Sequence, residues 1–268
     1  MADNTLTFGT SSIAKVEPDR ITIRGRDLCD ELIGKISFTH YFLFLLTGQE
    51  PTRELVAITD ACLVAIAEHG FVPSIQAARM TYAAAPDALQ GAVSAGLLGC
   101  GTVILGASET AGILLADILK RQETDATDID TAAIAVLRDL REARLPVPGF
   151  GHPVHKAEDP RATRLLKVAN ELGVAGKHVE ALQAVERHIE TAYGRFLPLN
   201  VSAAIPAVLL DADFPLESLR GVPLVARTGS LVAHLLEEQR NPLGFKIATR
   251  AEQGIAYDGQ LAGKRRGT

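Results

Sequence analysis

The sequence predicts an all-α globular protein with a short β-hairpin near its N-terminus. Apolar residues recur every three or four positions over most of the chain, which is the spacing of one face of an α-helix. Proline, aspartate and glycine stand where these apolar runs begin and end, as they do at helix termini. With 268 residues and 47% hydrophobic content, the chain can bury the core of one large domain or two modest ones.

The first elements change from strand spacing to helix spacing near residue 27. Residues 13–16 and 20–24 form short alternating runs around Glu17-Pro18-Asp19, which predicts a small hairpin. From Leu28 to Leu46 the apolar residues follow a helical period, which ends at Gly48.

The rest of the chain predicts a succession of short helices. Thr52 opens one that ends at residues 68–70, and the polar, acidic run 122–128 marks a crossing between two domains. Pro206 interrupts the helix expected over 199–210. The other expected helices cover residues 73–82, 86–98, 108–121, 129–144, 162–172, 178–193, 215–219 and 223–240.

Composition argues against several classes of protein. The net charge is −5, without a basic block before residues 264–266, so no nucleic-acid partner is expected. The longest apolar stretch, residues 97–119, is broken by polar and small residues, which predicts a core helix and no membrane contact. The N-terminus lacks the pattern of a secretory signal. Three cysteines in apolar contexts without paired spacing predict reduced, buried thiols in a cytoplasmic protein: Cys29, Cys62 and Cys100.

Residues 147–161 form the stretch around which the chain is organised. Two glycines and three prolines in this stretch exclude a continuous helix or a central strand, so the backbone is held in turns. Two histidines, a lysine and an arginine lie here beside two carboxylates, and Asp159-Pro160 fits the start of a helix. Such a loop either carries chemistry or is an ordinary surface loop with solvated charges.

The pattern G-F-G-H-x-V-x-K-x-x-D-P-R, from Gly149 to Arg161, resembles the signature loop of the citrate synthase superfamily. This superfamily includes 2-methylcitrate synthases and the citryl-CoA lyase module of ATP-citrate lyases. Residues 23–52 resemble the N-terminal "RGYDI…F…LLxGxLPT" run of the family, and residues 227–239 resemble its "R..G..AH..EQ" helix. The resemblance covers nearly the whole chain.

The resemblance implies a citrate synthase-like helical fold of two domains. Residues 1–121 and 221–268 would form a large domain, and residues 122–220 a smaller one. It also implies a homodimer or higher homo-oligomer with sites in a cleft, acting on an acyl-CoA and a di- or tricarboxylate. Neither a metal-binding cluster nor an ATP-type glycine-rich loop is visible in the sequence.

The resemblance also assigns roles within the loop and the later helix. His152 would contact the reacting carbonyl and hydroxyl of the substrate, since a histidine can exchange a proton near neutral pH and donate to an oxyanion. Arg161 and Arg227 match the arginines that bind the substrate carboxylates through their paired donors. Lys156 matches a residue that meets CoA phosphate, with His155 as a possible helper.

Two interpretations fit His69. A histidine in the last turn of a helix complements the helix dipole, with Gly70 as a left-handed cap. The run Ala67-Glu68-His69-Gly70 also resembles the "ADHG" of the citryl-CoA lyase module, whose histidine lies in the active site. The resemblance therefore adds His69 to the catalytic candidates.

Two positions depart from the synthase pattern. Leu105 stands where citrate synthases have the histidine of "HGGA", which holds the enol of acetyl-CoA, and the lyase module also has an apolar residue there. The arginine that synthases lend across the dimer falls on Ile247, where Lys246 or Arg250 could compensate. Leu105 therefore argues against a standard synthase.

A third departure concerns proton transfer. Ser202 replaces the aspartate of "NVD", which moves the proton at the acetyl carbon in both classes. A serine hydroxyl stays protonated at neutral pH and cannot serve as a carboxylate base. Either another carboxylate takes the place of the aspartate, with Glu68 and Glu109 as the nearest candidates that the sequence offers, or the reaction differs from that of the family.

The sequence thus predicts a citryl-CoA lyase-like enzyme that cleaves the C–C bond of a 3-hydroxy acyl-CoA, giving acetyl-CoA and oxaloacetate from citryl-CoA. Coenzyme A would take part as substrate or product, without a metal. The alternatives are a citrate or 2-methylcitrate synthase and a non-catalytic CoA- or carboxylate-binding paralogue. The predicted site residues are His152, His69 and Ser202 for catalysis, Arg161 and Arg227 for carboxylates, and Lys156 and His155 for CoA.

Overall fold

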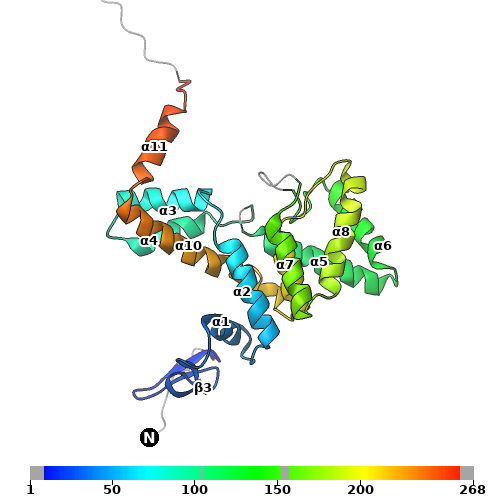
Figure 1. The fold of residues 1–268 in the computed structure, drawn as a ribbon, viewed down its shortest axis with the longest axis horizontal. Helices are drawn as coiled ribbons and strands as arrows, with labels where there is room; N and C mark the ends of the chain where they lie inside the picture. Colours follow the sequence, from blue (N-terminus) through cyan, green and yellow to red (C-terminus); the bar gives the residue numbers. More distant parts are fainter. Residues whose placement is uncertain (1–8, 104, 152–156, 260–268) are drawn as a thin grey trace, which may run out of the picture. The chain divides into compact units, whose positions relative to one another are not determined.

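A computed structural model describes the chain as a mostly helical protein with short strands near its N-terminus (Figure 1). The described residues are 9–103, 105–151 and 157–259. The all-α class predicted from apolar periodicity is confirmed. Within those ranges, no helix combines the length and the apolar character needed to cross a bilayer.

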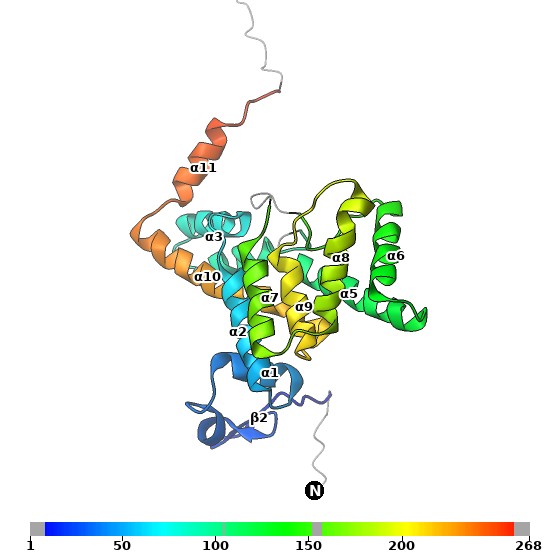
Figure 2. The same ribbon diagram turned by 45° about the vertical axis from the view of Figure 1, so that its right-hand side comes forward.

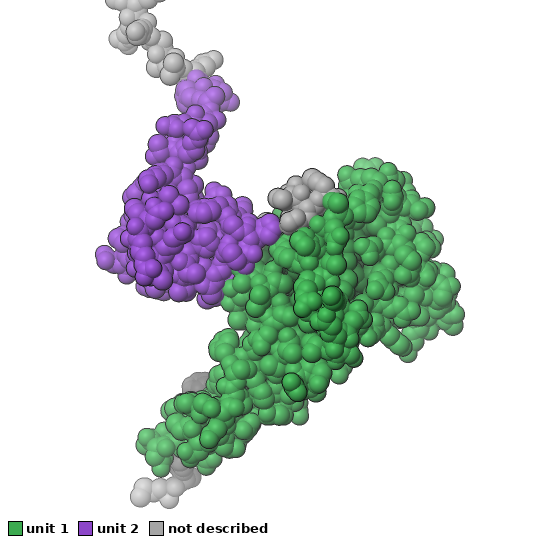
Figure 3. All heavy atoms as spheres, in the orientation of Figure 1, with its two compact units in different colours: residues 1–67, 102–226 green, residues 68–101, 227–268 purple. Residues whose placement is uncertain are grey.

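The chain divides into two compact units, which are coloured separately in Figure 3. Unit 1 comprises residues 1–67 and 102–226, and unit 2 comprises residues 68–101 and 227–268. The domains expected from the family resemblance stay a prediction.

A three-stranded antiparallel sheet lies near the N-terminus, in the order β1-β2-β3. Its strands are β1 (Ala14–Val16), β2 (Ile21–Ile23) and β3 (Arg26–Asp27). β1 and β2 pair with Ala14 opposite Ile23, which confirms the predicted hairpin. β3 was not predicted, because two residues are too few to show an alternating pattern.

Two helices follow the sheet and cover it with a small apolar cluster. They are the π-helix η1 (Leu28–Leu32) and α1 (Phe38–Thr47). The Ser37 side chain caps α1 by accepting from the His40 N–H, and Gly48 ends it in a left-handed conformation, as predicted. The buried residues of the cluster are Ile23, Leu32 and Phe44.

Unit 1 is built around α9 (Val201–Asp211), which is buried on nearly every side. A helix without a polar face must lie inside the fold. Figure 2 shows α9 between α7 and α8, and it also packs against α2 and α5. The helices around it are α2 (Arg53–Ala67), α5 (Ala107–Thr124), α7 (Pro160–Leu172) and α8 (Lys177–Tyr193), and α6 (Ile129–Glu142) packs on α5 and α8.

The prediction that Pro206 interrupts this helix is wrong, because α9 continues through it. A proline has no N–H for the carbonyl four residues earlier, which here belongs to Ser202. That carbonyl lies in the first turn, so the loss is confined to the start of the helix. A second predicted helix, residues 215–219, forms only a 3₁₀ turn, η2 (Leu216–Ser218).

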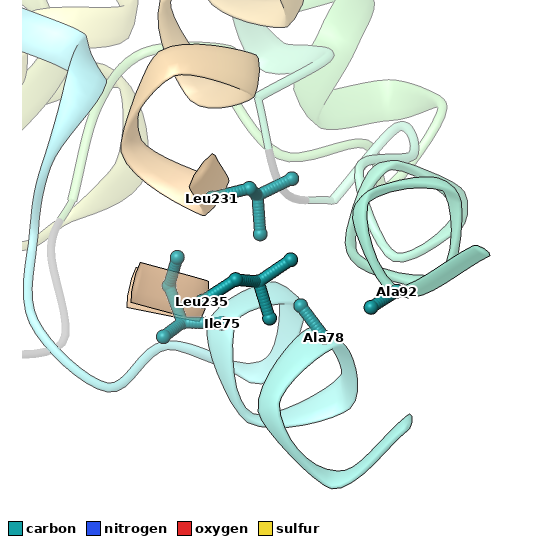
Figure 4. Packing of buried hydrophobic residues seen from close by; sticks show 5 residues of the cluster. All are labelled: Ile75, Ala78, Ala92, Leu231 and Leu235. Carbon is teal, nitrogen blue, oxygen red and sulfur yellow. The ribbon is translucent and has the colours of Figure 1, made fainter. Parts of the chain in front are cut away.

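Unit 2 contains the C-terminal part of α10 (Gly221–Arg240) together with α3 (Pro73–Ala84), α4 (Leu89–Leu98) and α11 (Gly244–Gln253). Its core is shown in Figure 4 and consists of Ile75, Ala78, Ala92, Leu231 and Leu235. A Cβ on Gly96 would lie 2.5 Å from a methyl carbon of Leu231, so the absence of a side chain there lets α4 approach α10. α11 was not predicted, because flanking glycines and Pro242 obscure its short amphipathic pattern.

Candidate functional site

We call residues 147–161 the central loop. The described start of this loop is hydrogen-bonded to the residues that precede α9. The Gly151 N–H donates to the Pro198 carbonyl at 2.8 Å, and the Asn200 side-chain amide donates to the Gly151 carbonyl at 2.7 Å. The Asn200 N–H donates to the Gly149 carbonyl at 2.9 Å. These hydrogen bonds therefore fix the backbone of Gly149 and Gly151 against the start of α9. Three predicted site residues follow and lie outside the described residues: His152, His155 and Lys156.

Gly149 lies against the first turn of α9. Its φ is +79°, a left-handed conformation, and a Cβ added there would lie 2.9 Å from both Cα and the backbone nitrogen of Ala203. Glycine meets both constraints because it has no side chain. The close contact explains why the sequence has glycine at this position.

Asp159 joins the N-terminal ends of two helices. It is fully buried, and it caps α7 by accepting from the Arg161 N–H at 3.1 Å. It also accepts from Arg161 Nε at 3.0 Å and Nη2 at 2.8 Å, and from the Val201 N–H of α9 at 3.0 Å. Burial alone would raise the pKa of Asp159, but the hydrogen bonds and the charge of Arg161 lower it below its usual value.

Ser202 is the second residue of α9, and its position is fixed by the helix cap. The Asn200 side chain accepts from the Ser202 N–H at 2.9 Å, while its amide nitrogen holds the central loop. Arg161 and Val201 donate to the same Asp159 oxygen, so the predicted carboxylate-binding residue is tied to the residue that directly precedes Ser202. The starts of α7 and α9 also present partial positive charge to an anion.

A second polar cluster lies in unit 2 around the carboxylate of Glu68. Its Oε1 accepts from the backbone N–H groups of His69 at 3.0 Å and Gly70 at 2.6 Å. Its Oε2 accepts from the Ser230 hydroxyl and lies 3.1 Å from His234 Nε2. Gly70 has the left-handed conformation predicted for it, with φ +72°.

Arg227 lies near this cluster, on the part of α10 that carries Ser230 and His234. It is only 2% exposed. Burial lowers the pKa of Arg227, and the charge of the Glu68 carboxylate acts in the opposite direction. A buried guanidinium with an altered pKa is a candidate for binding a carboxylate. Two predicted site residues, His69 and Arg227, thus both belong to unit 2.

The positions that depart from the synthase pattern lie in different surroundings. Leu105 is buried and adopts a left-handed conformation with φ +67°, which is unusual for a residue with a side chain. Glu109 lies 3.5 Å from Arg220 at a partly exposed position. Lys246 and Arg250 are both exposed on α11.

Sequence reasoning missed most of the residues that hold these predicted groups. Asp159 was identified as a helix cap, but not as the partner of Arg161 and Val201. His234 and Arg79 were not singled out, because their partners lie more than 150 residues away along the chain. In the described residues, no group of three or more histidine, cysteine or acidic side chains is arranged to hold a metal ion.

The model for "Citrate synthase, C-terminal domain" matches residues 8–248, which is most of the chain. The chain belongs to the citrate synthase family. Curated relatives include the citrate synthase of Haloferax volcanii, 30% identical over 200 residues, which cover 74% of this chain and 50% of that one. The citrate/2-methylcitrate synthase of Bacillus subtilis is 29% identical over 216 residues, covering 79% and 55%. The chain therefore spans about half the length of these relatives.

A solved structure of similar length is citryl-CoA lyase from Hydrogenobacter thermophilus. It superposes with a TM-score of 0.83 and 28% identity, and the match covers 96% of this chain and 97% of the lyase. ATP citrate lyase from Methanothrix soehngenii, solved with citrate and coenzyme A, superposes with a TM-score of 0.79 over 96% of this chain and 42% of that one. At 21% identity the second likeness shows the fold alone. The citrate synthase-like fold is confirmed, and the family indicates an enzyme of the citrate synthase and citryl-CoA lyase type.

Proposed function

We propose that this family member is a citryl-CoA lyase, which cleaves citryl-CoA or a related 3-hydroxy acyl-CoA into acetyl-CoA and oxaloacetate or a related oxo-acid. The likeness to the Hydrogenobacter lyase carries this proposal, because it extends over 96% of one chain and 97% of the other. The curated synthases are about twice as long as the part that matches. Leu105, where the synthases have a histidine, also favours the lyase.

The reaction begins at the tertiary hydroxyl of the substrate. His152, assisted by His69, takes the hydroxyl proton, and the oxygen forms the carbonyl of the oxo-acid while the C–C bond breaks. The electron pair of that bond passes to the acetyl carbon and gives the enolate of acetyl-CoA. A proton then returns to this carbon, so the reaction consumes no other reactant.

Two arginines, the partly buried Arg161 and the buried Arg227, supply charge for the substrate carboxylates. Arg161 is oriented by Asp159 and Arg227 is carried by α10, and each guanidinium can offer paired donors to a carboxylate. Lys156 and His155 would hold the phosphates of CoA. The proposed ligands are therefore an acyl-CoA and a di- or tricarboxylate, and the homodimer and the cytoplasmic location stay expectations from the sequence.

Ser202 takes a different role from the aspartate that it replaces. Its hydroxyl can donate a hydrogen bond to the enolate oxygen as negative charge develops there, but it cannot hold the charge of a base. Glu109 is adjacent to Arg220, and Glu68 accepts four hydrogen bonds, so neither carboxylate is poised as a simple substitute. We therefore assign the proton returned to carbon to the histidine that removed it.

The test is a coupled assay in which malate dehydrogenase reports oxaloacetate released from citryl-CoA. We expect turnover by the parent and a loss of about 10²- to 10⁴-fold in His152→Ala, the usual effect of removing a general acid–base. Arg161→Met should raise KM, and Arg164→Met is its control, because Arg164 lies exposed on the same helix. A parent that releases no oxaloacetate would contradict the proposal.

Two other functions have specific support. A citrate or 2-methylcitrate synthase is favoured by the names of the curated relatives, and it would condense an acyl-CoA with oxaloacetate and release free CoA. A non-catalytic CoA- or carboxylate-binding paralogue is favoured by Ser202. It would bind its ligand without turnover, and Ser202→Asp would then introduce activity that the parent lacks.

A further inference from the structure

The turn that carries His69 is held at both ends by side chains of α10 and α3. At its start, the Glu68 carboxylate bridges the N–H groups of His69 and Gly70 to Ser230 and His234. At its end, the Phe71 ring meets the His234 ring edge-on, with 5.7 Å between centroids, and it lies 5.0 Å from the Arg79 guanidinium. His69 therefore lies between two anchored residues.

The hydrogen-bond partners of His234 fix its tautomer. Its Nδ1 lies 3.3 Å from Arg79 Nη1, and its Nε2 lies 3.1 Å from Glu68 Oε2. A guanidinium only donates hydrogen bonds, so Nδ1 must accept. The hydrogen of the neutral ring is then on Nε2, where it donates to the Glu68 carboxylate.

The far end of this chain of bonds is a buried ion pair. Arg79 is 0% exposed, and it donates from Nε to Glu238 and from Nη1 to Glu237, both at 2.6 Å. Glu238 also accepts from the backbone N–H groups of Leu243 at 2.8 Å and Gly244 at 2.7 Å. Separating Arg79 from Glu238 would leave an uncompensated buried charge. The guanidinium of Arg79 is therefore held in place.

We propose that Glu68 is a positioning residue for His69: held by Ser230 and by the fixed tautomer of His234, it clamps the 69–70 backbone and gives the His69 imidazole one orientation. This inference rests on the proposed function, in which His69 meets the reacting hydroxyl. Glu68 would not touch the substrate. Its contribution is to keep His69 in place between turnovers.

The surroundings of Glu68 fit this role better than that of a base replacing the family aspartate. An ionised carboxylate offers about four acceptor sites, and the turn and α10 supply four donors to it. Burial alone would raise the pKa of Glu68, but the hydrogen bonds from Ser230, Gly70 and His234 lower it. Proton uptake by Glu68 would break part of the clamp that it forms.

Glutamine at this position should break the clamp with little change in side-chain size. Its NH₂ group only donates, so it would face either the two backbone N–H groups or Ser230 and His234. The Ser230 hydroxyl can turn to accept, but the Nε2–H of His234 cannot. His234 cannot relieve the conflict by changing tautomer, because its Nδ1 already accepts from Arg79. Aspartate keeps both acceptor oxygens and is the conservative variant.

The test combines kinetics with long-range proton–nitrogen NMR spectra of the histidine rings, assigned with His69→Gln and His234→Gln. We expect an Nε2-protonated His234 in the parent and shifted His69 ring signals in Glu68→Gln. kcat for citryl-CoA should fall about 10- to 100-fold, as expected for a misplaced catalytic group, with a smaller change in KM. Glu68→Asp should recover part of kcat. Gln239→Ala, an exposed position on α10, the helix that carries Ser230 and His234, should match the parent in both measurements.

The inference is overturned if Glu68→Gln leaves the His69 signals and kcat at parental values. If the parent does not cleave citryl-CoA, the proposed function fails and the spectra alone decide: shifted His69 signals support positioning, and unchanged signals overturn it. If Glu68→Gln does not fold, Ser230→Ala, which removes one of the four donors, replaces it with the same criteria.

Discussion

Alanine at Gly149 tests how the central loop is docked on α9. The backbone there is left-handed, with φ +79°, and a new Cβ would lie 2.9 Å from Cα and from the backbone nitrogen of Ala203. Both atoms belong to the first turn of a buried helix. They cannot move aside as the end of a flexible side chain can.

Two costs add in Gly149→Ala. A side chain in the left-handed conformation costs about 1–2 kcal/mol, and overpacking against a fixed neighbour costs about 1–3 kcal/mol. The free energy of unfolding should therefore fall by about 2–5 kcal/mol. Gly151→Ala is the matched control, because its φ is +85° but its new Cβ would be 3.7 Å from the nearest atom, a methyl carbon of Leu197. Only the first cost, about 1–2 kcal/mol, applies there.

Urea unfolding followed by circular dichroism measures the difference between these variants. With an m-value of about 2 kcal/mol per M, the midpoint of Gly149→Ala should lie about 0.5–1.5 M below that of Gly151→Ala. Equal midpoints would refute the close contact with Ala203. A catalytic defect shared by both variants would instead point to the loop conformation.

Three further predictions concern buried charges and thiols. Asp159→Asn should lower the free energy of unfolding by about 3–5 kcal/mol at pH 7, as expected for breaking a buried pair. Because folding lowers the pKa of Asp159, its contribution to stability is complete above about pH 4 and is lost as the pH falls through the folded pKa. The urea midpoint of the variant should therefore vary less between about pH 5 and 2 than that of the parent. Arg79→Met should destabilise unit 2 by about 3–5 kcal/mol, so the backbone amides of unit 2 should exchange hydrogen faster than in the parent. Exchange of these amides at the parental rates would contradict this. The expectation of three buried thiols is wrong for Cys29, which is exposed. Burial raises the pKa of Cys62 and Cys100, so a thiol reagent should label one cysteine in the native protein, and rapid labelling of three would contradict the burial.

Local patterns were enough to predict most of the helices and several of their ends. Gly48 and Asp159 act through neighbours a few residues away, so their roles can be deduced from spacing. Pro206 was misjudged because the cost of a proline depends on which carbonyl loses its donor, and here the carbonyl lies in the first turn. α11 was missed because ten residues between turn signals give a weak periodic pattern.

The site was predictable only where motif and chemistry coincide. Arg161 and Ser202 were identified from the family pattern, but the Asp159 carboxylate that joins Arg161 to Val201, the residue before Ser202, became visible only in three dimensions. The same holds for Glu68 and His234, which are 166 positions apart in the chain. No local pattern encodes such a pair, because its geometry depends on how α10 packs.

The most direct test of the lyase assignment is a product analysis of citryl-CoA after incubation with the protein. The CoA species are separated by chromatography, and oxaloacetate is measured in the same sample. A lyase yields acetyl-CoA and an equal amount of oxaloacetate, without free CoA. Free CoA and citrate would indicate the thioester hydrolysis of a synthase, and unchanged citryl-CoA would indicate a protein that only binds; either result would contradict the account.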